Sequence, residues 1–389
     1  TLGEIATLVN EKWKHGDESD LKYVGLEHIQ QNTGILQDVG LSSEVSSTKT
    51  RFKQGDILFG KLRPYFRKVV QVDFEGISST DIWVIRSKKD VDQKYLYYLL
   101  YDQKFVDLAT QTSTGTRMPR ANWDYLQEVK IKIPRSIEKQ KEIAHMLSVF
   151  DEKIEVLRKE NQALEELAQA LYKRWFVEFN FPDESGKSYR ENGGEMVDSE
   201  LGLIQKGWRI GNIFSIANRS SQSINPSNFP SKIFQYYSIP TYDQCGKEVS
   251  EFGNNIKSNK YIVSENDVLV SKLNPRFKRI IYASKAKDLI CSTEFVIWSS
   301  KNKFFKNFLY TLANSDSFIE YCQQSATGTS GSHRRVNPDR MMNYQFPLRY
   351  EIQELFGKEM NPMYMKVELN LSQIQTLTET KERLLSKLI

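Results

Sequence analysis

A stretch in the first third of the chain decides the fold, because the second half repeats it. Residues 56–68 read DILFGKLRPYFRK, and residues 267–279 read DVLVSKLNPRFKR. Further matches follow in the same order: STDI at 79–82 with STEF at 292–295, and TGT at 114–116 with TGT at 327–329. A period of roughly 213 residues is too long for a solenoid. The sequence therefore predicts a duplicated domain.

A long helical stretch follows each copy. No proline or glycine stands between Pro134 and Pro182, and Ser136 can cap the start of the first helix. Apolar residues then recur at the 4-3 spacing of a coiled-coil seam. Two such stretches, each roughly 60 Å long, favour pairing with each other over packing of each helix on its own domain. Pro362 lies inside the second stretch and is expected to kink or restart the helix.

The predicted seam is mostly apolar, with a polar residue at three positions. An antiparallel arrangement would bring the seam asparagines Asn161 and Asn370 close together. A seam asparagine fixes register at a cost in stability, so we hypothesise that Asn161→Leu stabilises the pair and loosens its register. The seam positions are Ile143, Leu147, Phe150, Ile154, Leu157, Asn161, Leu164, Ala168, Leu171 and Trp175 in the first helix, and Phe356, Met360, Met363, Val367, Asn370, Ile374, Leu377, Lys381, Leu384 and Leu388 in the second.

The globular parts combine strands with short helices. Runs of β-branched and aromatic residues predict strands, and they occur at 57–59 and 82–85 and again at 268–270 and 295–298. Helices are expected at 95–106 and 304–313. The predicted fold class is α+β: two tandem-duplicated α+β domains separated by two long antiparallel coiled-coil helices. The expected segments are 1–134 (first domain), 135–181 (first long helix), 182–206 (a polar, turn-rich linker), 207–347 (second domain) and 348–389 (second long helix).

Composition places the chain among ordinary globular proteins. Of 389 residues, 39% are hydrophobic and 26% are charged, and no apolar run has membrane-spanning length. The three cysteines are far apart and form neither a disulfide framework nor a zinc-binding spacing, which favours a reducing, cytoplasmic compartment. The start, TLGEI, is too acidic for a signal peptide. It also lacks the lead-in that Gly207 and Trp208 give the second copy, so we expect the native start to be trimmed.

Catalytic motifs are absent from the sequence. The four histidines have no metal-ligand spacing, and no Asn-Pro pair is followed by the second proline of an amino-methyltransferase pocket. A nuclease motif could be assembled from Pro338, Asp339, Glu379 and Lys381, but Lys381 is a seam position. We expect no catalytic residue, metal or cofactor in this chain. Two other functions stay open beside the DNA-binding one developed below. The chain could be an enzyme with a cryptic methyltransferase or nuclease site, or an interaction scaffold that binds no DNA.

The remaining candidates for a functional site are residues in basic loops. Hydroxyls, glycine amides and arginines suit phosphate oxygens, and arginine and asparagine also read base edges. Leu62, Phe66, Leu273 and Phe277 in these loops are predicted to be core. The two loops share their Lys, Leu, Pro and Phe residues but differ in their polar residues, which would let the two copies recognise different DNA sequences. The candidate DNA-binding residues are Lys61, Arg63, Tyr65, Arg67, Thr114, Thr116, Arg117 and Arg120 in the first copy, and Lys272, Asn274, Arg276, Lys278, Thr327, Thr329, His333, Arg334 and Arg335 in the second.

Several stretches resemble one family along essentially the whole chain. They read GDIL at 55–58, IKIP at 131–134, RWFVEF at 174–179 and SELGLIQKGW at 199–208, where Gln205 replaces the usual proline. With the two domains and two long helices, the sequence resembles the specificity subunits of type I restriction–modification systems.

The resemblance implies a function in DNA recognition. Each domain would read one half of a bipartite target, and the helix pair would set the gap between the halves. Two modification subunits, which carry S-adenosylmethionine and the adenine-methyltransferase site, would dock on the helices, and translocase/nuclease restriction subunits would join them. A fused methyltransferase–nuclease is an alternative partner. The aromatic cluster at 175–179 would either meet the modification subunits or pack at the helix end.

Overall fold

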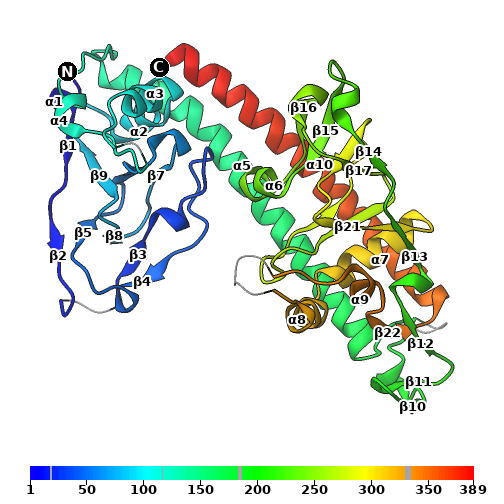
Figure 1. Cartoon of the computed structure of the whole chain (residues 1–389). Coiled ribbons are helices and arrows are strands. Elements are labelled where there is room, and N and C mark those ends of the chain that lie inside the picture. The colour runs from blue at the N-terminus through cyan, green and yellow to red at the C-terminus, as the bar shows by residue number, and fades with distance from the viewer. Residues whose placement is uncertain (18–19, 116, 183–185, 329–333) are drawn as a thin grey trace. The chain divides into compact units, whose positions relative to one another are not determined.

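The chain folds into two compact units, each described here by itself (Figure 1). Unit 1 comprises residues 1–157 and 372–389, and unit 2 comprises residues 158–371. Each unit contains one globular part and a portion of both long helices. The computed structural model describes residues 1–17, 20–115, 117–182, 186–328 and 334–389.

Unit 1 is built from a four-stranded and a five-stranded sheet with short helices. The four-stranded sheet has the antiparallel order β1 (Ala6–Leu8), β9 (Ile82–Ser87), β6 (Ile57–Gly60), β7 (Val69–Gln71). The five-stranded sheet has the order β2 (Lys12–Trp13), β5 (Lys49–Phe52), β8 (Gly76–Ser78), β3 (Lys22–Val24), β4 (Gly40–Leu41), with β3 and β8 parallel. The helices are α1 (Leu2–Ile5), α2 (Gln93–Tyr101), α3 (Gln103–Gln111) and α4 (Trp123–Leu126).

Unit 2 repeats this plan with additions. Its four-stranded sheet has the order β13 (Ala217–Ser220), β21 (Phe295–Ser300), β18 (Asp267–Ser271), β19 (Ile280–Tyr282). Its five-stranded sheet has the order β14 (Ser223–Ile224), β17 (Lys260–Ile262), β20 (Leu289–Cys291), β15 (Ile233–Tyr237), β16 (Val249–Phe252), with β15 and β20 parallel. Two-stranded sheets join β10 (Met196–Ser199) to β11 (Gly202–Gln205) and β12 (Arg209–Asn212) to β22 (Gln345–Leu348). The helices are α6 (Ile239–Cys245), α7 (Lys303–Ala313), α8 (Asp316–Ser325) and α9 (Pro338–Met342).

The strand orders of the two units match position for position, which confirms the predicted α+β duplication. The helix predicted at 95–106 is wrong in one respect, because Asp102 has extended backbone angles and separates α2 from α3. The predicted linker also contains regular structure. Beyond its undescribed residues 183–185 it forms the β10–β11 hairpin, and the Tyr189 ring stacks on Phe181 with ring centres 5.1 Å apart.

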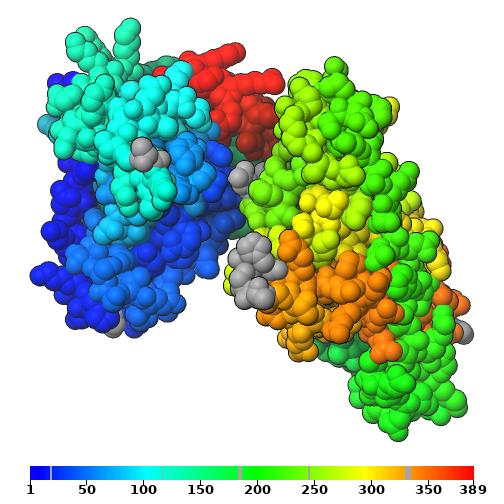
Figure 2. All heavy atoms as spheres, viewed as in Figure 1, coloured from blue at the N-terminus to red at the C-terminus, as the bar shows by residue number. Residues whose placement is uncertain are grey.

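One of the two interior strands of each four-stranded sheet, β6 in unit 1 and β18 in unit 2, is buried on both faces. Ile57 and Phe59 of β6 pack in the cluster that contains α2 and α3, whereas Leu58 packs against the five-stranded sheet. Val268 and Leu269 of β18 divide between two clusters in the same way. Because successive strand residues point to opposite faces, a continuous apolar run suits a strand covered on both sides. In Figure 2 the helices of unit 1 (cyan) and its strands (blue) occupy adjoining parts of the visible surface.

The two long helices run antiparallel within each unit. They are α5 (Ile137–Tyr172), which continues into a π-helical turn at Lys173–Val177, and α10 (Tyr350–Leu388). Every predicted seam position is buried or half-buried. The expected restart at Pro362 is wrong, because α10 is continuous there; a helix tolerates a proline when packing compensates for the lost hydrogen bond. None of the helices among the described residues has a stretch long and apolar enough to cross a bilayer.

Polar residues meet in one seam layer of each unit. In unit 2, Asn370 Nδ2 donates to Asn161 Oδ1 at 2.8 Å and to Glu160 Oε2 at 3.0 Å. In unit 1, Lys381 Nζ lies 2.6 Å from Asp151 Oδ1, and the Tyr98 hydroxyl donates to the other carboxylate oxygen of Asp151 at 2.7 Å. Lys381 is only 3% exposed, so this ion pair is part of the seam.

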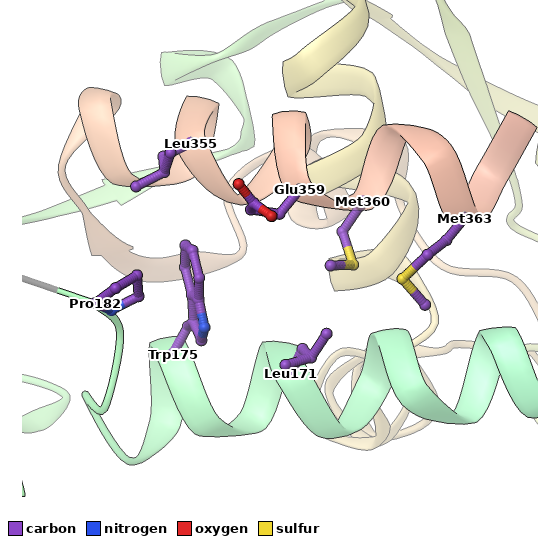
Figure 3. A pocket seen from close by; sticks show the side chains of 7 residues that line it. All are labelled: Leu171, Trp175, Pro182, Leu355, Glu359, Met360 and Met363. Carbon is purple, nitrogen blue, oxygen red and sulfur yellow. The ribbon is translucent and has the colours of Figure 1, made fainter. Parts of the chain in front are cut away.

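The end of the helix pair in unit 2 is closed by aromatic residues. Trp175, Phe176 and Phe179 are buried, and the Trp175 ring lies 5.4 Å from the Phe356 ring. Of the two interpretations of this cluster, the structure therefore shows packing at the helix end. Figure 3 shows a pocket of about 480 Å³ that remains beside Trp175, and its other lining residues are Leu171, Pro182, Leu355, Glu359, Met360 and Met363.

One buried lysine distinguishes unit 2 from unit 1. Lys306 of α7 is 3% exposed, and its Nζ donates to the carbonyl oxygens of Glu265 at 2.5 Å and Ala283 at 2.8 Å. Burial lowers the pKa of Lys306 to about 7. The equivalent residue in unit 1 is the neutral Gln93, whose amide donates to the Gly55 carbonyl at 2.9 Å.

Lys306→Gln is expected to remove a pH dependence of stability. Because the pKa of Lys306 is lower in the folded than in the unfolded chain, the unfolded chain binds more protons above about pH 7. The free energy of unfolding should therefore rise from pH 7 to pH 9, by at most about 1.4 kcal/mol per pH unit, and the Gln variant should lack this rise. Chemical denaturation of both proteins at pH 7, 8 and 9 measures it, and equal rises in both would contradict the assignment.

Candidate nucleic-acid interface

The predicted basic loops are brought together by the four-stranded sheet of each unit. In unit 1, the loop at 60–68 leaves β6, the turn at 79–82 enters β9, and the segment made of residues 114–115 and 117–121 follows α3. We call these three segments junction 1. Their counterparts in unit 2 are residues 271–279, 292–295, 327–328 and 334–336, which we call junction 2.

Backbone hydrogen bonds hold junction 1 together. Lys61 N donates to Asp81 O at 3.0 Å, and Ala121 N donates to Lys61 O at 2.9 Å. Arg63 N donates to Pro119 O at 2.7 Å. Each of the three segments is therefore fixed to at least one other without the use of a side chain.

Junction 2 repeats these bonds one for one. Lys272 N donates to Glu294 O at 2.9 Å, Val336 N donates to Lys272 O at 2.9 Å, and Asn274 N donates to Arg334 O at 2.8 Å. The backbone is also left-handed at the same place in both, with φ of 50° at Arg63 and 54° at Asn274. A positive φ at a residue other than glycine stores strain, which is common at functional sites.

An ion pair spans each junction. Arg120 Nε lies 3.0 Å from Asp81 Oδ1, and Arg335 lies 3.0 and 3.1 Å from the two carboxylate oxygens of Glu294. The hydrogen-bonded carboxylate raises the pKa of Arg335. Sequence reasoning named both arginines but missed Asp81 and Glu294, although the repeated STD and STE tripeptides carry the signal.

Exposure divides the predicted DNA-binding residues into groups. Lys61, Arg63 and Lys272 are half-buried. Thr116, Thr329 and His333 lie outside the described residues. The exposed residues are Tyr65, Thr114, Arg117 and Arg120 in junction 1, and Arg276, Lys278, Thr327, Arg334 and Arg335 in junction 2.

Arg67 is a correction to the sequence-based assignment. It is 6% exposed, its Nε donates to the Tyr101 carbonyl at 2.7 Å, and its guanidinium lies 3.8 Å from the centre of the Tyr101 ring. Its Nη2 also lies 3.0 Å from Glu382 of α10. Arg67 therefore binds the loop to α2 and α10 and does not present its charge on the surface.

Two residues of junction 2 also differ from expectation. Asn274 was predicted to contact DNA but is buried, and its backbone N–H donates to the Arg334 carbonyl oxygen at 2.8 Å. Phe277 was predicted to be core but is 48% exposed, and the guanidinium groups of Arg276 and Arg279 lie 4.7 and 4.9 Å from its ring centre. Aromatic residues that stack on arginine are stable at a surface.

The chemistry available at the junctions is that of binding. Arginine, lysine and threonine side chains surround glycine turns, and among the described residues no group of histidine, cysteine and carboxylate side chains could hold a metal ion. Such surfaces suit anionic oxygens and base edges.

Comparison with known proteins gives the class to which this fold belongs. Residues 1–166 match the family described as the type I restriction modification DNA specificity domain. The chain is 27% identical over 311 residues to the type I restriction enzyme MjaIX specificity subunit of Methanocaldococcus jannaschii, a match that covers 78% of this chain and 69% of that protein. It is 26% identical over 220 residues to the HindI specificity subunit of Haemophilus influenzae, with 53% and 46% covered.

A solved structure shares the fold of the whole chain. The crystal structure of the type I restriction–modification system S subunit from M. genitalium matches with a TM-score of 0.57 at 17% identity, covering 100% of this chain and 95% of that one. The family match thus assigns the class of DNA specificity domains to residues 1–166. These matches confirm the resemblance to type I specificity subunits that the sequence indicated.

Arg67→Ala is expected to destabilise unit 1. Breaking a buried ion pair costs about 3–5 kcal/mol, and we expect roughly 2–3 kcal/mol here because Glu382 is partly solvated. The matched control is Lys278→Ala, which removes the exposed counterpart in junction 2 and should change stability by less than about 0.5 kcal/mol. Denaturant unfolding checks both, and equal effects would show that Arg67 is not buried as described.

Proposed function

We propose that this chain is the DNA-recognition subunit of a type I restriction–modification complex, in which each junction reads one half of a bipartite target. The observation that carries the proposal is one junction built twice. Its backbone bonds are the same in both units, but its exposed side chains differ: Tyr65 in junction 1 corresponds to Arg276 in junction 2. A shared backbone arrangement that carries different exposed side chains suits two domains that recognise two different DNA sequences.

The long helices would set the gap between the half-sites. At 1.5 Å per residue, the 36 residues of α5 and the 39 of α10 span roughly 54 and 58 Å. Half-sites read from one face of B-DNA are about 34–36 Å apart, or a multiple of that distance. A helix pair of this length is long enough to serve as such a spacer.

The outer faces of the helices would dock two modification subunits. In unit 1, α5 exposes Met146, Val149 and Val156, which are 47, 49 and 56% exposed. In unit 2, α10 exposes Met365 and Leu369, which are 61 and 52% exposed. Apolar residues that recur along one exposed helix face favour a protein partner. The repeat places Val156 and Leu369 at equivalent positions, so each patch offers an apolar residue at this one shared position.

Catalysis would reside in the partners. Modification subunits would supply S-adenosylmethionine and adenine methylation, and restriction subunits, or a fused methyltransferase–nuclease, would supply cleavage. The chain itself would be non-catalytic, with no cofactor of its own. A cytoplasmic location, predicted from cysteine usage, accords with a chromosomal DNA target.

A methylome tests this proposal. The chain would be expressed with its modification subunit in a host that lacks adenine methylation, and modified adenines would be mapped. A split motif with two short defined parts and one fixed gap is expected. A folded chain that directs no methylation with its modification subunit would reject DNA recognition in favour of an interaction scaffold.

Arg117→Ala is expected to affect only one half-site. Arg117 is exposed on junction 1, and junction 1 shares no residue with junction 2. The ratio of the affinity for the cognate duplex to the affinity for a duplex changed in the first half-site should fall about 10-fold. This fall is equivalent to about 1.4 kcal/mol of discrimination. Titration of duplexes with a change in either half checks this. Equal loss of discrimination at both halves would contradict independent readers.

The contact between Asn161 and Asn370 revises the hypothesis made from the sequence. Asn370 is fully buried, and its Oδ1 already lacks a hydrogen-bond partner. Asn161→Leu alone should therefore destabilise the pair, by about 1–3 kcal/mol, since it leaves the buried amide of Asn370 with one partner fewer. Replacing both asparagines by leucine should restore or exceed wild-type stability.

The same double variant tests the role of register. If the asparagine layer fixes the register of the pair, the Asn161→Leu, Asn370→Leu chain should methylate targets of more than one gap length. Thermal unfolding and a methylome of the double variant measure the two effects. A stable double variant that still methylates a single gap length would show that other contacts set the register.

A further inference from the structure

The arginine–carboxylate pair is presented in nearly the same way by both junctions. The side chains of Arg120 and Arg335 are 44 and 45% exposed, and those of Asp81 and Glu294 are 28 and 27% exposed. The backbone oxygen of each carboxylate residue also accepts a hydrogen bond from the loop that follows β6 or β18. The donors are the backbone N–H groups of Lys61 in junction 1 and Lys272 in junction 2. The pair is therefore held by the hydrogen-bonded backbone that both junctions share, and it does not belong to the exposed side chains that differ between them.

The surrounding residues have diverged while this pair has been retained. Junction 1 carries Arg63 and Tyr65 where junction 2 carries Asn274 and Arg276. Residues that read different half-sites are expected to differ between the copies. A residue common to both copies suits a feature common to both half-sites, and the phosphate backbone is the feature that every DNA sequence shares.

A hydroxyl group accompanies each arginine. Thr114 and Arg120 form an antiparallel bridge with backbone bonds of 3.0 Å, and Thr327 and Arg335 form the same bridge with bonds of 2.9 and 2.8 Å. Residues directly opposite in an antiparallel pair project to the same face. Guanidinium and hydroxyl donors on one face suit the oxygens of a phosphodiester.

The carboxylates would hold the guanidinium groups in place before DNA arrives. An arginine side chain has several rotatable bonds, and fixing it in advance reduces the entropy lost on binding. In junction 1 the contact uses Nε of Arg120, and among the described residues its two terminal nitrogens form no hydrogen bond. In junction 2 the contact is bidentate, to both oxygens of Glu294.

We propose that Arg120 and Arg335 are equivalent phosphate anchors, one for each half-site, and that Asp81 and Glu294 are the residues that position them. This inference rests on the proposed function. It divides the candidate residues into two classes. The anchors supply affinity that does not depend on base sequence, and the diverged tips supply the discrimination between bases.

The test measures DNA binding by the complex of the full chain with its modification subunits. Arg120→Ala and Arg335→Ala should each weaken binding about 5- to 10-fold on cognate and altered duplexes alike, and each should reduce the slope of log K against log salt by about 1. The double variant should reduce it by about 2. Arg120→Lys should keep the slope, because it keeps the charge. The methylated motif should stay unchanged in all of them.

Matched variants separate anchoring from folding. Arg219 also forms an exposed ion pair, 2.7 Å from Asp339 with 38% side-chain exposure, and Arg219→Ala should leave DNA affinity unchanged. Asp81→Asn and Glu294→Gln should weaken binding with little change in melting temperature, because exposed ion pairs add little stability.

Three outcomes would overturn the proposal. Wild-type affinity and salt slope in Arg120→Ala and Arg335→Ala would show that neither arginine contacts DNA. Relaxed base preference in one half-site would make the arginine a base reader. Absence of salt-dependent DNA binding by the wild-type complex would reject the proposed function itself, and the anchors with it.

Discussion

Burial of one strand on both faces is the constraint on which the rest of each unit depends. Strand β6 places Ile57 and Phe59 against helices and Leu58 against the second sheet, so it cannot shift by one residue without exchanging the two faces. The loop at 60–68 leaves the end of this fixed strand, and the turn at 79–82 enters its neighbour β9. The position of the candidate interface is therefore set by the core, and loop residues can change without moving it.

Comparison of the two copies shows which parts of the interface are shared and which differ. Backbone bonds need no particular side chain, and they are the same in both junctions. Side chains at the tips are solvated and carry little of the stability, so they can diverge at low cost. The buried Arg67 and its exposed counterpart Lys278 show that divergence also reaches residues beneath the tips.

Much of the architecture was predictable from the sequence, and the failures have identifiable physical causes. The repeat and the 4-3 spacing were sufficient to predict two α+β domains and two long helices, because periodicity reports burial directly. Arg67 and Phe277 were misassigned because a basic or aromatic residue in a loop can pack or be solvated, and only the tertiary neighbours decide. Asp81 and Glu294 were missed because the repeated STD and STE tripeptides show that the acidic residue recurs but do not show that it pairs with an arginine.

The two polar seam layers also bear on how copies of the chain could combine. Because the helices are themselves a repeat, α5 of one molecule could in principle pair with α5 of another. In that arrangement Asn161 would face Leu157, and Asp151 would face Ala168, the residue equivalent to Lys381. Pairing of two α10 helices would likewise set Lys381 against Tyr364 and Asn370 against Ile374. Each of these pairings buries an amide or a charge without its partner, which is costly, so the seam favours pairing of α5 with α10 over pairing of like helices from two molecules.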